Sequence, residues 1–106
     1  MTEEKNLFWH IGEDFLQEQD ITKGTLMGFP CLRVNGNFFA TADHRTGDLI
    51  VKLSKDRVQS LINKGVGSPF KPAGRVFKEW VLIKHRDDVL WKRLISEAKE
   101  FVDRNS

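Results

Sequence analysis

The fold is decided by the stretch LRVNGNFFATA at residues 32–42. Asn35 and Gly36 form the dipeptide that best tolerates the two positive φ angles of a type I′ turn, so they predict a β-hairpin. Its arms are residues 32–34 and 38–42. After a turn at residues 43–47, the β-branched run LIVKL at residues 49–53 predicts the next strand. Short connections of this kind make the strands antiparallel.

Extended structure is also expected on either side of this block. Residues 25–29 predict an extended stretch that stops at Pro30, because proline cannot donate to a central ladder. Residues 67–74 contain two prolines and two glycines, so they predict a loop with at most a short extended piece around Phe70. Residues 76–84 predict a further strand, whose apolar residues at both parities indicate that both faces are at least partly covered.

Three helices are predicted around these strands, each with one apolar stripe. The first covers residues 2–19 and has Thr2 as its N-cap, and the second is a short helix that Ser54 caps and Gly65 ends. The third begins after Asp87 or Asp88. The stripes consist of Leu7, Phe8, Ile11 and Phe15 in the first helix, Val58, Leu61 and Ile62 in the second, and Trp91, Leu94, Ile95, Ala98, Phe101 and Val102 in the third.

The order of these elements predicts an α+β fold. It runs helix, three strands, helix, one or two strands, helix, which is written α-β(3)-α-β(2)-α. Because each helix has a single apolar stripe to bury, the simplest arrangement is two layers, with the helices on one antiparallel sheet. The 106 residues fit one domain, residues 1–106, and leave no room for a second.

The composition excludes several classes of protein. The chain is 40% apolar and 30% charged with a formal net charge of +2, which is neither a histone-like polycation nor an acidic tail. No window approaches the roughly 18 apolar residues of a membrane span, and the first ten residues lack the apolar region of a secretory signal. With Cys31 alone, no intrachain disulfide can form, and a reducing compartment is the default. We therefore expect a cytoplasmic protein that does not enter the membrane.

The sequence contains no motif for catalysis or metal binding. His10, His44 and His85 lack a second ligand at the short spacings that helices and turns use for metals. The glycines match neither a dinucleotide fingerprint nor a phosphate loop, and no serine stands in a nucleophile elbow. We therefore expect a protein that is not an enzyme, with no catalytic residue, no cofactor and no metal.

The segment at residues 43–45 and the single cysteine can each be interpreted in two ways, as a functional group or as a structural one. Asp43, His44 and Arg45 have the composition of a general-base group, but a polar turn tip shaped by Asp43 and Gly47 is favoured. Cys31 follows a proline in an apolar run and is favoured as a small buried hydrophobe over a reactive thiol.

Charge is distributed unevenly along the chain. Residues 1–50 hold four Lys/Arg and eight Asp/Glu, a net of −4, whereas residues 51–106 hold thirteen and seven, a net of +6. If the cations between residues 52 and 86 lie on one side, they form a positive surface that suits phosphates or an acidic protein. The alternative is a solvated helix and sheet edge that use lysine for solubility. These cations are Lys52, Lys55, Arg57, Lys64, Lys71, Arg75, Lys78, Lys84 and Arg86.

Several segments resemble a known family over nearly the whole chain. They are Met27-Gly28-Phe29-Pro30, Val34-Asn35-Gly36 with Phe38-Phe39-Ala40, residues 49–53, Gly67-Ser68-Pro69-Phe70 and Trp80-Val81. The chain resembles small bacterial TfoX N-terminal-like domains and is similar to the MmcQ/YjbR-like family. This resemblance implies a secretion-chaperone-like, YjbR-like layer fold and a regulatory role of unassigned biochemistry, with a likeness to DNA-binding folds. It implies no catalytic residue.

The function expected from these observations is a regulatory module that binds a macromolecule through a basic surface, with nucleic acid or an acidic protein as partner. The residues expected to make contact are Lys55, Arg57, Lys71, Arg75 and Lys78, with residues 69–74 as the specific loop. The alternative is a protein-interaction or homodimerisation domain that uses a sheet face or edge. A small-molecule or enzymatic role comes third and would require a deep pocket.

Overall fold

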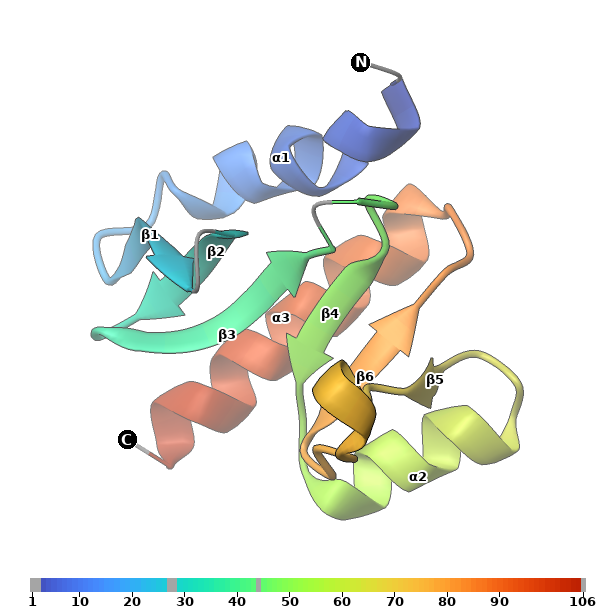
Figure 1. Ribbon diagram of the computed structural model, residues 1–106. Coiled ribbons are helices and arrows are strands. Elements are labelled where there is room, and N and C mark those ends of the chain that lie inside the picture. The colour runs from blue at the N-terminus through green and yellow to red at the C-terminus, as the bar shows by residue number, and fades with distance from the viewer. Residues whose placement is uncertain (1–2, 27–28, 44, 106) are drawn as a thin grey trace.

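The computed structural model describes residues 3–26, 29–43 and 45–105 (Figure 1). The chain begins with a helix, continues with strands on both sides of a second helix, and ends with a long third helix. The elements are α1 Glu3–Phe15, β1 Ile21–Leu26, β2 Phe29–Val34, β3 Asn37–Ala42, β4 Leu49–Lys52, α2 Lys55–Asn63, β5 Ser68–Pro69, the 3₁₀ turn η1 Pro72–Gly74, β6 Trp80–Ile83 and α3 Asp88–Arg104.

The described strands form one six-stranded sheet in the order β1-β2-β3-β4-β6-β5, and every neighbouring pair is antiparallel. The α+β class, the antiparallel sheet and the alternation of helices with groups of strands are therefore confirmed. The first group differs in detail, because it contains four strands where three were expected. The additional strand is β1, which begins almost directly after the first helix.

The extended stretch expected at residues 25–29 is wrong in its bounds. The register pairs Thr25 with Pro30 and Leu26 with Phe29, so this segment contains the end of β1 and the beginning of β2. Pro30 consequently lies within a strand and does not terminate one. The sheet tolerates it because pairing between β2 and β3 begins only at Cys31, so no β3 residue pairs with the proline. Residues 27–28 lie outside the described residues.

Helix α1 is shorter than expected at its C-terminal end. Its stripe is confirmed, since Phe8 and Ile11 are buried in the core. The helix ends at Phe15, four residues before the expected end, because Ile21 is itself buried and pairs with Val34 of β2. The intervening residues are needed to turn the chain from the helix into the sheet. The expected cap, Thr2, lies outside the described residues.

The hairpin between β2 and β3 is confirmed. Asn35 and Gly36 have φ values of 51° and 86°, the two positive angles of the predicted turn. A β-bulge then shifts the register beside Leu32, and Phe39 has no partner in β2. The bulge explains why two consecutive residues of β3, Phe39 and Ala40, are both fully buried.

Helix α2 begins and ends as predicted. The Ser54 hydroxyl accepts a hydrogen bond from the Arg57 backbone N–H at 3.2 Å. At the other end Gly65 has a φ of 75°, and Val66 N–H donates to the Leu61 carbonyl at 2.9 Å. This is the Schellman arrangement, which satisfies the last carbonyls of the helix.

Helix α3 is the main support of the sheet. The Asp87 carboxylate accepts a hydrogen bond from Leu90 N–H at 3.1 Å, which selects Asp87 over Asp88 as the N-cap. Most of the predicted stripe is buried, and Phe101 is half-buried against it. The members that are less than 1% exposed are Trp91, Leu94, Ile95 and Ala98.

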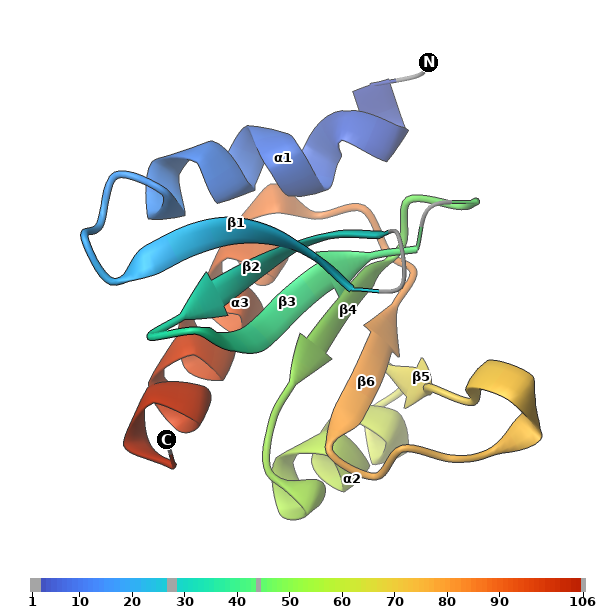
Figure 2. The same cartoon turned by 60° about the vertical axis from the view of Figure 1, so that its left-hand side comes forward.

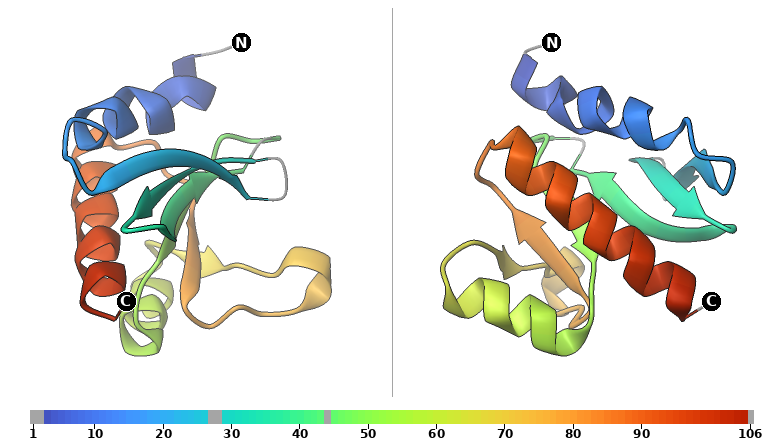
Figure 3. Two further views of the ribbon diagram at one scale, coloured as in Figure 1. Left: turned by 90° about the vertical axis from the view of Figure 1, so that its left-hand side faces the viewer. Right: turned by 180° about the vertical axis from the view of Figure 1, so that it is seen from behind.

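The three helices lie on one face of the sheet, so the two-layer arrangement is confirmed (Figures 1 and 3). Val51 of β4 and Val81 of β6 belong to the core that these helices cover. The opposite face carries the row of residues with the other parity. This row runs across the strands through Cys31, Thr41, Ile50 and Leu82.

Candidate functional site

Between β5 and β6 the chain leaves the sheet as a projecting arm, residues 70–79 (Figures 2 and 3). Phe77 N–H donates to the Phe70 carbonyl at 3.0 Å, so the two sides of the arm are joined near its base. The rings of the same two residues pack edge to face, with centroids 5.9 Å apart. The arm is therefore a short hairpin closed by a backbone hydrogen bond and an aromatic pair.

The tip of the arm is a tight turn. Ala73 has a φ of 55° and Gly74 a φ of 80°, and Arg75 N–H donates to the Pro72 carbonyl at 3.2 Å. Two positive φ angles define a type I′ turn, and a left-handed conformation costs a residue with a Cβ about 1–2 kcal/mol. Ala73 is thus held in a strained conformation at the tip. The predicted irregular character of this region is confirmed, apart from the short β5 and η1.

The returning side of the arm was expected to be a strand from residue 76, and that expectation is wrong at its beginning. Strand β6 starts only at Trp80, because Trp80 N–H donates to the Phe77 carbonyl at 3.1 Å and closes a turn. Within β6 the predicted partial cover of both faces is confirmed, since Val81 is buried and Trp80 is half-buried. Before the turn, Val76 and Phe77 are 48% and 40% exposed.

A shallow depression lies where the base of the arm meets the start of α2. Its lining is a mixture of cations, apolar side chains and one acid. The cations come from two elements, with Lys55 from the first turn of α2 and two from the arm. The lining residues are Lys55, Arg75, Val76, Phe77, Lys78, Glu79 and Trp80. We call this site the basic depression.

The structure thus brings together three of the five residues expected to make contact, Lys55, Arg75 and Lys78. A fourth, Lys71, lies on the same arm, next to the turn at its tip. Within the described part of the chain, none of these four side chains forms an ion pair. Their charges remain available to a partner.

Arg57 does not belong to this surface. Its Nε and Nη2 atoms bind the two carboxylate oxygens of Glu97 on α3, at 3.1 and 3.2 Å. Residues two apart on a helix point in nearly opposite directions, so Lys55 and Arg57 cannot share one face. Helical spacing could have separated these two residues from the sequence alone.

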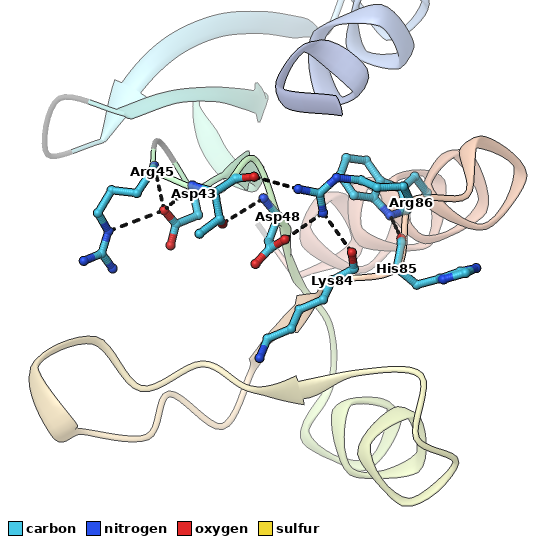
Figure 4. Close-up of polar contacts among 8 residues, drawn as sticks. Asp43, Arg45, Asp48, Lys84, His85 and Arg86 are labelled. Carbon is cyan, nitrogen blue, oxygen red and sulfur yellow. Dashed lines mark hydrogen bonds and ion pairs between the residues drawn. The ribbon is translucent and has the colours of Figure 1, made fainter. Parts of the chain in front are cut away.

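Arg86 does not belong to the positive surface either. Figure 4 shows its guanidinium between the turn that precedes β4 and the end of β6, with hydrogen bonds to Asp48 and to the Lys84 carbonyl. Lys64 lies at the far end of α2. The nine cations of the middle region therefore do not act as one group. Lys55, Arg75 and Lys78 line the basic depression, whereas Arg57 and Arg86 are paired with acids elsewhere.

The turn at residues 43–48 has the polar, structural character that was favoured. The Asp43 carboxylate accepts hydrogen bonds from the backbone N–H groups of Arg45 and Thr46, at 2.8 and 3.4 Å. Gly47 has a φ of 81° and donates its N–H to the Asp43 carbonyl at 2.7 Å. Asp43 is thus occupied in shaping the turn. His44 lies outside the described residues.

Cys31 is fully buried, as expected of a small hydrophobe. Burial raises the pKa of its thiol, and the positive charge of Arg33 offsets part of that rise. Across residues 3–26, 29–43 and 45–105, no group of three His, Cys, Asp or Glu side chains is placed to hold a metal ion. None of the described helices is both long enough and apolar enough to cross a membrane.

Sequence reasoning missed the exposed apolar members of the basic depression, Val76 and Phe77. A signal for the arm was nevertheless present. Phe70 and Phe77 stand symmetrically about the Ala73-Gly74 pair, as the two sides of a hairpin do. Comparison of the chain with protein-family models, with curated proteins and with solved structures finds no significant match.

Proposed function

We propose that this protein is a non-enzymatic, cytoplasmic regulatory module that binds nucleic acid through the arm and the basic depression. The observation that supports this proposal is the gathering of Lys55, Arg75 and Lys78 around one depression, with no ion pair in the described part of the chain. Cations without acidic partners are the groups that displace counterions from a phosphate backbone. The resemblance to TfoX N-terminal-like and MmcQ/YjbR-like domains leads to the same proposal.

Nucleic acid is favoured over an acidic protein by the residues between the cations. Phe77 is exposed and Trp80 is half-buried, and both line the same depression as the basic side chains. Cations interleaved with aromatic rings are typical of surfaces that bind a phosphate backbone and its bases together. The arm also projects from the sheet (Figure 2), which gives it access to a groove or to an extended strand.

The experiment is a titration of DNA, duplex and single-stranded, at two salt concentrations. We expect log K to fall with log[salt], by about 0.9 for each neutralised phosphate of a duplex and about 0.7 for a single strand. Replacing Lys55, Arg75 and Lys78 by alanine should weaken binding and flatten this dependence. The matched control replaces Lys64, Lys92 and Arg93, which are exposed cations elsewhere on the molecule.

The two triple variants remove the same charge, so a difference between them locates the binding surface. Equal losses in both would mean that only the net charge matters. Absence of binding to both DNAs at low salt would overturn the proposed function.

A second candidate function is homodimerisation or interaction with another protein. The observation in its favour is the exposure of Val76 and Phe77, at 48% and 40%, on a projecting arm. Light scattering over a range of concentrations distinguishes this candidate. A dimer that persists after charge reversal at Lys71 and Arg75 would favour the apolar contact over the basic one.

A further inference from the structure

We infer that the basic depression binds a single strand of nucleic acid, with one base stacked on the ring of Phe77. This inference rests on the proposed function and names the kind of nucleic acid. Two groups of observations lead to it, the arrangement of the aromatic rings and the arrangement of the charges around them.

The first group concerns how the aromatic residues are placed. Phe77 and Trp80 stand at the two ends of one turn, closed by the hydrogen bond from Trp80 N–H to the Phe77 carbonyl. The turn is anchored to the chain that leaves β4, because Leu53 N–H donates to the Glu79 carbonyl at 2.9 Å. Both rings are therefore carried by a turn that is hydrogen-bonded to the residue directly after β4.

Phe77 is restrained and yet accessible. Phe70 contacts it edge to face across the arm, with an interplanar angle of 69°. In spite of this contact, Phe77 remains 40% exposed. A ring that is restrained before binding loses little conformational entropy when a base stacks on it, which makes such a ring an effective stacking platform.

The second group concerns charge. Lys55 lies on α2, and Arg75 and Lys78 lie on the arm, so cations approach the depression from two elements. Glu79 is the one acid in the lining, which leaves the lining with an excess of two positive charges. Phosphates on either side of a stacked base can therefore contact a cation. An acidic peptide would bind the cations equally well, but its carboxylates would not stack on the exposed ring.

A single strand fits these features better than a duplex. In a duplex the base faces are stacked on one another, so a protein reaches only base edges, sugars and phosphates. The exposed ring of Phe77 would then gain nothing from contact with a duplex. In a single strand the base faces are accessible, and each stacked base contributes to affinity with little dependence on sequence.

The experiment compares a short dT oligomer with a duplex of the same length, by fluorescence anisotropy of labelled DNA at low salt. Phe77→Leu keeps an apolar contact with Phe70 but removes the aromatic face, whereas Phe77→Trp keeps a ring. We expect Phe77→Leu to weaken oligomer binding by about 5- to 100-fold, the loss of one stacked base, and to leave duplex binding unchanged. Phe77→Trp should retain oligomer binding.

Val89→Ala is the matched control, because Val89 is an exposed apolar residue, 66% accessible, on α3. Thermal unfolding of each variant verifies that the fold is retained. Because stacking carries no charge, the salt dependence of oligomer binding should be the same for Phe77→Leu as for the original protein.

The outcomes separate this inference from the proposed function. Equal binding of oligomer and duplex, both indifferent to Phe77→Leu, would overturn the single-strand inference and keep nucleic-acid binding. Oligomer binding that both Phe77→Leu and Phe77→Trp leave intact would also overturn it. Binding of polyglutamate with no binding of either DNA would overturn the inference and the proposed function together.

Discussion

Arg86 is bonded to Asp48, with its Nη1 atom 2.6 Å from the Asp48 Oδ1 atom. The same guanidinium donates to the Thr46 carbonyl at 2.6 Å and lies over the ring of Trp91, 5.4 Å from its centroid. One side chain thereby joins the turn before β4 to the segment that leads into α3. The Asp48 side chain is only 13% exposed, so it depends on this partner.

Replacing Arg86 by alanine should lower the free energy of unfolding by about 1–3 kcal/mol, because a largely buried carboxylate and two backbone carbonyls then lose their donor. Urea denaturation measures the change. Arg86→Lys should recover only part of the loss, since one ammonium cannot reproduce the planar set of hydrogen bonds. In a double-mutant cycle with Asp48→Ala, strictly additive effects would show that the two residues are not coupled.

The backbone conformation of Ala73 predicts that one substitution at the tip of the arm stabilises the protein. The Ala73 φ of 55° lies in the left-handed region, which strains most residues that have a Cβ. Asparagine is an exception and tolerates this conformation. We expect Ala73→Asn to raise the free energy of unfolding by about 0.5–1 kcal/mol, and Ala73→Val to lower it. The comparison is made by denaturation of both variants. A lower stability of Ala73→Asn would contradict the turn described for the arm.

Replacement by alanine should have opposite effects on stability at Gly67 and at Gly12. A Cβ on Gly67 would lie 2.5 Å from Val81 Cγ2 in the core, so Gly67→Ala should cost about 1–3 kcal/mol of stability. A Cβ on Gly12 would meet Trp9 and Leu32 at 3.4 and 3.6 Å, which are ordinary contacts. Gly12→Ala should therefore stabilise the protein by up to about 1 kcal/mol through helix propensity. Similar midpoints of thermal unfolding for the two variants would refute this prediction.

Burial of Cys31 predicts a pH effect with a definite sign. Because the pKa of its thiol is raised in the folded protein, the unfolded thiol loses its proton first as the pH rises. The free energy of unfolding should therefore fall above the pKa of an unfolded thiol and be unaffected below it. Cys31→Ala should show a smaller decline in the same range. In the native protein a thiol reagent at neutral pH should react only slowly; rapid labelling would show that Cys31 is accessible.

Substitutions of Arg57 and Lys78 should separate an effect on folding stability from an effect on DNA affinity. Arg57→Ala removes the pair with Glu97, in which each side chain is about one-third exposed, and should cost about 0.5–1 kcal/mol of stability. It should leave DNA affinity within about twofold of the original, whereas Lys78→Ala should weaken binding and leave the thermal midpoint unchanged. A large loss of DNA affinity in Arg57→Ala would show that Arg57 contributes to the binding surface after all.

Local rules predicted most of the secondary structure correctly, because the features involved are local. The Asn35-Gly36 turn, the Ser54 and Asp87 caps and the Gly65 ending each depend on a few neighbouring residues. Two errors of extent in the strands, at residues 25–29 and at residue 76, have a different origin. Both segments have strand-like composition, and which of their residues pair depends on the partner strands, such as β2 for β1 and β4 for β6.

The sequence by itself determined the class of fold, the alternation of helices with groups of strands, and the excess of cations in the second half of the chain. Helical spacing already separates Lys55 from Arg57, but the tertiary structure decided which of the other cations lie together. It turned Arg57 toward Glu97 and Arg86 toward Asp48, and it left Lys55, Arg75 and Lys78 around the arm. The physical reason is that an ion pair between distant segments depends on how those segments pack, whereas turns and caps depend on backbone angles and hydrogen bonds within a few residues.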